Sequence, residues 1–128
     1  MRAVVGKLVD RVWYVQAVVN VVTGLWPIVH LRSFEAVTGP KTDGWLVKTV
    51  GALVAVNGLV MASAGANKRI TPDVVGLAVG QSVSLAAADV VYVSRGRISR
   101  VYLLDAVLEV LLVVAWIANW RRRREQAA

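Results

Sequence analysis

Three carboxylates stand in the apolar second half of the chain, where an acidic side chain is costly to place. Asp89, Asp105 and Glu109 each interrupt a stretch made mostly of Val, Leu and Ala. An ionised side chain near the centre of a bilayer is unfavourable unless it finds a partner or water. Glu109 would lie about 13 Å along a helix from Arg100. At that depth it is expected to be protonated, hydrated in a cavity or paired with Lys48.

Other polar side chains recur at helical spacing around these acids. Gln16, Asn20, Thr23 and His30 fall within an arc of about 80° on a helical wheel, together with Pro27. The later stripes consist of Gln81, Ser84, Asp89 and Tyr92, and of Tyr102, Asp105, Glu109 and Trp116. We expect the three stripes to face one another and to form a polar column that is open at one end.

The candidate ligand-binding residues lie on these stripes or at the mouth of the column. They are Glu109, Asp105, Asp89, Asn20, Gln81, Tyr92, Tyr102, His30 and Lys48. The acids would supply charge, and the amides and tyrosines would orient a ligand. The alternative is structural: amides and hydroxyls commonly bond between membrane helices, Asp89 and Asp105 could pair with Lys48 or Arg97 at helix ends, and His30 could be a surface imidazole.

The sequence lacks the residues that most kinds of catalytic site require. One histidine and no cysteine leave no metal-ligand spacing. A GxxxxGK phosphate loop and a GxSxG nucleophile turn are also missing. Acid and base work by the carboxylates is the one enzymatic chemistry that the residues permit. We therefore predict no cofactor, no metal and no dedicated catalytic residue, and we favour a non-enzymatic role over an enzymatic one.

Four apolar segments must position these residues. The chain has 128 residues, 57% of them hydrophobic, and a mean hydropathy of +0.59, which exceeds that of ordinary soluble domains. Helices of about 20 residues span a bilayer, and the predicted ones cover residues 12–31, 45–64, 74–94 and 101–120. Short connections favour antiparallel neighbours. We predict one all-α domain over residues 1–128, an integral membrane four-helix bundle with antiparallel up-down topology and a basic tail at 121–128.

The net charge of +7 gathers at the ends of the apolar segments. This distribution is typical of contact with lipid headgroups rather than with nucleic acid. The side that would hold the termini and the middle loop carries nine Lys and Arg residues, and the other side carries six. The positive-inside rule therefore predicts an inner (plasma) membrane protein with both termini in the cytoplasm.

Small residues mark two packing faces. In the second segment a glycine recurs every seventh residue, at Gly44, Gly51, Gly58 and Gly65, which drifts by only about 20° per step around a helix. The third segment opens with Gly76 and Gly80 and continues the small-xxx-small pattern of closely packed membrane helices. These faces could serve within the bundle, in a homodimer or in a larger membrane complex.

The chain has four short spans with acids in the later helices, and it contains the stretches GLWPIVHLRSFEAVTGP and ADVVYVSRGRISRVYLLD. In these features it resembles the small bacterial four-helix membrane proteins of the DoxX-like kind. The chain is more distantly similar to the four-helix membrane domain shared by sterol isomerases and related lipid-binding proteins. That second resemblance implies membrane acids paired with a tryptophan, for which Glu109 and Trp116 are the candidates.

The leading functional hypothesis is a polar pocket, open to the non-cytoplasmic side, that binds or transports a small polar or amphipathic molecule. One alternative is an accessory subunit packed against a larger membrane complex through the Gly44 to Gly65 stripe. Another is a lipid-modifying membrane isomerase or hydrolase that uses the carboxylates. The three hypotheses differ in whether Glu109 meets a ligand, only neighbouring helices, or a reacting substrate.

Overall fold

The computed structural model describes residues 1–127, and within that range the chain is all-helical. The elements are α1 (Arg2–Asp10), α2 (Val12–Val29), α3 (Leu31–Thr38), α4 (Gly44–Ala66), α5 (Pro72–Ser94) and α6 (Tyr102–Ala127). In the described part, four helices, α2, α4, α5 and α6, are long and apolar enough to cross a membrane. The prediction of four long apolar helices is confirmed, whereas α1 and α3 were not anticipated.

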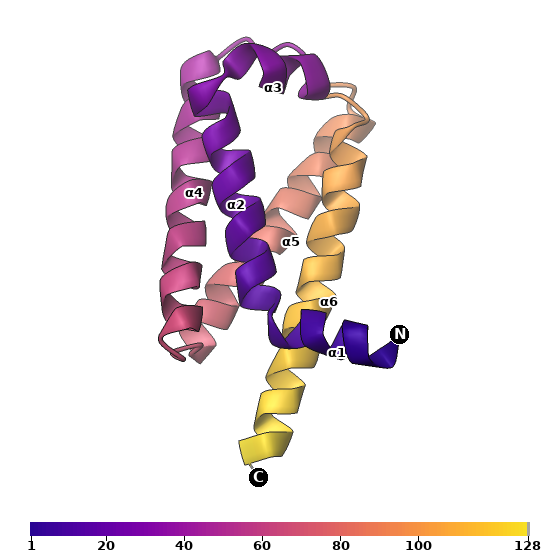
Figure 1. Cartoon of the computed structure of the whole chain (residues 1–128). Helices are drawn as coiled ribbons and strands as arrows, with labels where there is room; N and C mark the ends of the chain where they lie inside the picture. The colour runs from indigo at the N-terminus through magenta and orange to yellow at the C-terminus, as the bar shows by residue number, and fades with distance from the viewer. Residues whose placement is uncertain (128) are drawn as a thin grey trace.

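The long helices are arranged as two packed pairs. α2 packs along α4, and α5 packs against α6, with α5 running obliquely behind the other long helices in Figure 1. The short helix α3 crosses one end of the bundle, and both chain termini lie at the other end (Figure 1). Figure 1 also shows α1 turned across the long helices, against α6.

Glycine allows the backbones of α2 and α4 to touch. A Cβ atom added at Gly24 would overlap the carbonyl oxygen of Gly51, and one added at Gly51 would overlap the carbonyl oxygen of Gly24. Gly58 lies against the backbone of α2, and Gly65 lies against the ring of Trp13. The seven-residue glycine stripe therefore contacts α2, and a partner that used it would have to displace that helix.

The small-residue face of α5 is different. No atom lies within 4 Å of a Cβ added at Gly76 or Gly80. Ser84, the next residue of the pattern, is exposed. This face is thus open in the part of the chain that the structure describes.

The end of the bundle that carries the termini is closed by a well-packed core. This core consists of Val12, Ala17, Met61, Ala78, Leu112 and Trp116. Trp116 and Met61 are fully buried. Because these large side chains fill the closed end, the space between the helix pairs is left toward the α3 end.

The bundle is apolar outside and polar inside. On the outer faces of three long helices, Val22, Leu53 and Leu111 are each at least 60% exposed. The buried polar and charged side chains of the long helices are Gln16, Asn20, Ser82, Asp89, Glu109 and Asn119. A soluble protein rarely exposes apolar surface on this scale.

Polar contacts tie α1 to the last turns of α6. Arg122 donates from Nη1 to the carbonyl oxygen of Gly6 over 3.2 Å and forms an ion pair with Asp10 at 3.4 Å. Asn119 donates from Nδ2 to the carbonyl oxygen of Val9 over 2.9 Å. The exposed apolar side chains of α1 are Val4, Val5 and Leu8. The two chain ends are therefore held together, with an apolar face of α1 left uncovered.

Candidate functional site

A cavity of about 570 Å³ lies between the two helix pairs, on the α3 side of the bundle. Apolar side chains of α4 and α5, such as Val47, Val54 and Leu85, form much of its wall. Five of the nine predicted site residues line it, namely Asn20, Tyr92, Tyr102, Asp105 and Glu109. The structure therefore brings residues from α2, α5 and α6 to one space.

The carboxylates meet where α5 and α6 pack. Glu109 is 2% exposed, and its Oε2 is buried without a hydrogen-bond partner among residues 1–127. Asp105 lies one turn earlier on α6 and borders the same cavity. Asp89, on α5, does not line the cavity but lies beside Asp105. Its Oδ2 is likewise buried and has no hydrogen-bond partner in the described chain. An unpaired buried acceptor is destabilising by about 1–3 kcal/mol.

None of these acids has a salt-bridge partner in the described range. The ion pair that the structure contains there joins Arg122 to Asp10 at the opposite end of the bundle. Lys48, expected to reach Glu109, is exposed on α4 and does not line the cavity. Counting residues from a helix end placed Lys48 at a suitable depth but did not show that its side chain points outward.

Lys41 is the basic residue that does border the cavity. Its Nζ donates to the carbonyl oxygens of Thr38 and Gly39 over 3.0 Å each. The same ammonium lies 5.0 Å from the centroid of the Tyr102 ring. Carbonyl oxygens and an aromatic face are favourable surroundings for a cation. Lys41 is thus held at the α3 end and is not paired with Glu109.

His30 has a structural position. It is exposed, and its Nδ1 accepts a hydrogen bond of 3.2 Å from the backbone N–H of Ser33 at the start of α3. The Ser33 hydroxyl donates to the carbonyl oxygen of His30 over 3.0 Å and accepts from Nε1 of Trp26 over 2.8 Å. These bonds hold the turn from α2 into α3, which places Phe34 and Thr38 at the cavity.

Gln81 joins three helices and does not line the cavity. It exchanges two hydrogen bonds with Asn20, of 3.3 and 3.0 Å, and its Oε1 also accepts from Nδ2 of Asn57 over 2.9 Å. This network connects α2, α4 and α5. Gln81 therefore serves as interhelical contact, while Asn20 both belongs to the network and borders the cavity.

A second polar cluster lies in the closed core. Gln16 is fully buried, and its Oε1 accepts from Nε1 of Trp116 over 2.5 Å. Its Nε2 lies 3.2 Å from the Ser82 hydroxyl oxygen and 3.4 Å from the carbonyl oxygen of Ala78. The predicted stripe on α5 was wrong here, because Ser82 is buried and Ser84 is exposed.

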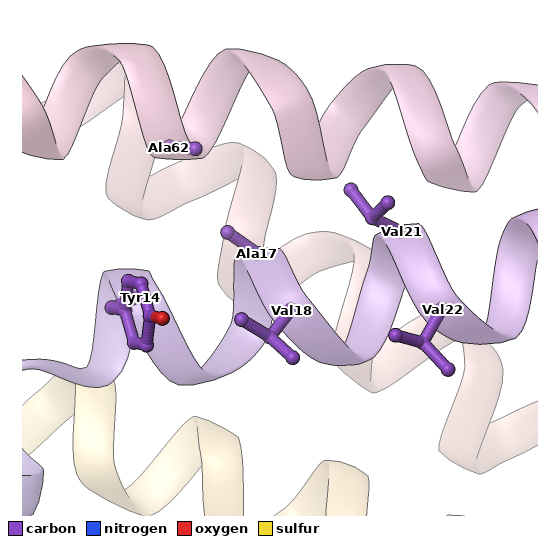
Figure 2. Close-up of a pocket in the computed structure, with 6 residues that line it drawn as sticks. All are labelled: Tyr14, Ala17, Val18, Val21, Val22 and Ala62. Atoms are coloured by element: carbon purple, nitrogen blue, oxygen red, sulfur yellow. The ribbon is translucent and has the colours of Figure 1, made fainter.

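A smaller hollow of about 250 Å³ lies on the outer side of α2 and α4. Figure 2 shows its lining, which consists of Tyr14, Ala17, Val18, Val21, Val22 and Ala62. Ala17 and Val21 point toward α4 in this view, and Val18 and Val22 point away from it. Because its wall is almost wholly apolar, this hollow has little to select one ligand over another.

In the described part of the chain, no group of three or more His, Cys, Asp or Glu side chains is placed to hold a metal ion. The arrangement is instead suited to hydrogen bonding and charge pairing by separate carboxylates in an apolar space. No protein-family model, curated protein or solved structure matches this chain.

Proposed function

We propose that the protein is an integral membrane four-helix bundle with antiparallel up-down topology. Its apolar exterior and buried polar groups support this assignment, since lipid replaces water as the surrounding solvent. Contacts between early residues of α2 and late residues of α4 support the topology. Trp13, early in α2, lies against Gly65, late in α4, and Gly24, later in α2, lies against Gly51, earlier in α4, as expected for helices that run in opposite directions.

Both termini would face the cytoplasm. The arginines that follow Trp120, together with the basic residues of α1, concentrate positive charge at the end of the bundle that carries both termini. The hydrogen bonds and ion pair of Arg122 support a shared location for the two chain ends. The cavity lies toward the α3 end and would therefore open to the non-cytoplasmic side.

This orientation is testable with single cysteines, because the chain has none of its own. In intact cells, a membrane-impermeant maleimide should label Asp43→Cys at the start of α4. Glu125→Cys, near the end of α6, should be labelled only after the cells are permeabilised. Both residues are exposed, so the two thiols are similarly accessible once the reagent reaches them. The reverse pattern would place the cavity on the cytoplasmic side.

Within this bundle, the cavity would bind or transport a small polar or amphipathic molecule. The main support for this function is the position of Glu109. Its carboxylate is buried, has an oxygen without a hydrogen-bond partner in the described chain, and lies at the edge of a cavity of about 570 Å³. Small-molecule sites are commonly about 300–1,000 Å³, mostly apolar, with a few placed polar groups. A ligand that donates a hydrogen bond to Glu109 would offset the cost of burying that group.

Filling the cavity provides the direct test. Val54→Trp should displace a co-purifying small molecule, because Val54 lines the cavity and an indole would occupy part of its volume. Leu53→Trp is the matched control, since Leu53 is the adjacent residue on α4 and is 62% exposed. Native mass spectrometry of the gently purified protein should show a discrete adduct that the control retains and Val54→Trp loses. A wild-type protein without any adduct would contradict the proposal.

A further inference from the structure

We propose that the ligand of this cavity is a cationic amphiphile, an organic amine or ammonium group on an apolar body. Its cationic head is bound by the carboxylates of Glu109 and Asp105, and its body lies against the valines of α4. This inference rests on the proposed binding function and specifies the ligand class.

The charge distribution at the cavity selects a cation. Glu109 and Asp105 border the cavity, and Asp89 lies behind Asp105. In the residues that the structure describes, none of the three carboxylates is in an ion pair. Glu109 is 2% exposed, and its Oε2 is buried with no partner in that range. A donor N–H on a positive head supplies the missing hydrogen bond and compensates the charge in the same contact.

Lys41 does not favour an anionic ligand. It is the one Lys or Arg residue among the described cavity-lining residues. Its ammonium already bonds the carbonyl oxygens of Thr38 and Gly39 and lies over the ring of Tyr102. An anion would have to compete with these contacts while facing Asp105 and Glu109. Lys41 also repels a second cation from the α3 end, so the head group is directed toward Glu109.

The remaining walls select an apolar body. Val47, Val50 and Val54 from α4 and Leu85 from α5 line the cavity. A bare metal ion would make no contact with these apolar side chains. It would also find no cluster of three or more ligating side chains in the chain as described. A small organic cation needs only one or two carboxylates and gains from burying its hydrocarbon part.

The experiment compares three probes of similar size that share one carbon skeleton and differ in the functional group at its end. These are 4-phenylbutylamine, 4-phenylbutanol and 4-phenylbutyrate, titrated by calorimetry into the full chain in nanodiscs of zwitterionic lipid. The amine should bind at least about tenfold more tightly than the other two. Glu109→Gln preserves the side-chain shape and removes the charge, so it should weaken amine binding about tenfold or more and leave the alcohol unchanged. Glu125→Gln, in the exposed tail, is the control.

Each other outcome has a distinct meaning. Equal binding of amine and alcohol, unaffected by Glu109→Gln, overturns the ligand class but retains a binding cavity. Preferred binding of 4-phenylbutyrate overturns it in favour of an anion held by Lys41. If none of the probes binds, the ligand class is overturned; an adduct that is lost in Val54→Trp then still supports the proposed function, and the absence of such an adduct refutes both. If Glu109→Gln fails to fold, Asp105→Asn at the half-buried neighbour gives the same comparison.

Discussion

Replacing Gly51 with alanine should destabilise the bundle, while the same replacement at Gly80 should leave it unchanged or make it more stable. At Gly51 the added methyl group meets the carbonyl oxygen of Gly24, which is backbone and cannot rotate away. Overpacking of this kind costs about 1–3 kcal/mol. At Gly80 the methyl group enters open space. Both variants gain the same helix propensity, about 1 kcal/mol for Gly→Ala, so the difference between them reports the contact between α2 and α4.

Thermal unfolding in one detergent, followed by circular dichroism, measures this difference. The midpoint should fall for Gly51→Ala and should stay or rise for Gly80→Ala. A rise for Gly51→Ala as large as that for Gly80→Ala would mean that α2 and α4 do not touch at this position, because only the gain in helix propensity would remain. A fall for Gly80→Ala would show that another helix, such as one from a second copy, covers the open face of α5.

Gln16→Leu should also destabilise the protein strongly, although it replaces a polar residue with an apolar one of similar size. Gln16 is fully buried and connects α2 to Ser82 on α5 and to Trp116 on α6. Its loss leaves the Trp116 indole N–H without an acceptor in a core that water does not reach. Leaving a buried donor unpaired costs about 1–3 kcal/mol, whereas an average interhelical hydrogen bond in a membrane protein contributes about 0.6 kcal/mol.

A double-mutant cycle isolates one of these bonds. Gln16→Leu, Ser82→Ala and the double variant are unfolded by denaturant in the same detergent, with exposed Gln126→Leu as the control. The double variant should be more stable than the sum of the single effects predicts, because the second change removes a group that the first has already left unpaired. Strict additivity would show that Gln16 and Ser82 do not interact.

Hydropathy and helical periodicity predicted the long helices well. Lipid imposes a length and an apolar surface on a spanning helix, so the four long segments are visible in the sequence. On α6 the predicted stripe from Tyr102 to Trp116 does face inward, with Glu109 and Trp116 buried. The short helix α3 could not be predicted in the same way. It is eight residues long, and its position depends on the contacts of Ser33 with His30 and Trp26.

Only part of the site was predicted. The sequence gives the depth of a residue along its helix, but it does not give the direction in which the side chain points. Counting residues gave the depth of Lys48 but not the direction of its side chain, whereas Lys41 reaches the cavity from the turn after α3. On α5 the predicted stripe included Ser84, whereas Ser82 is the buried serine, because Gln81 and Asp89 face different neighbours. Such assignments depend on the rotation of each helix within the bundle. Packing partners that are distant in the sequence determine that rotation.

The separation of the core from α3 has a consequence for local opening. Trp116, Met61 and their neighbours lie toward the termini, whereas α3 covers the other end. A movement of α3 would therefore break the Ser33 and Trp26 contacts and none of the core contacts. Regions with few buried contacts open at a fraction of the free energy of global unfolding. The protein thus consists of a stable base around Trp116 and a less stable helix α3 that can open on its own. Amide hydrogen exchange is expected to be fast in α3 and slow around Trp116.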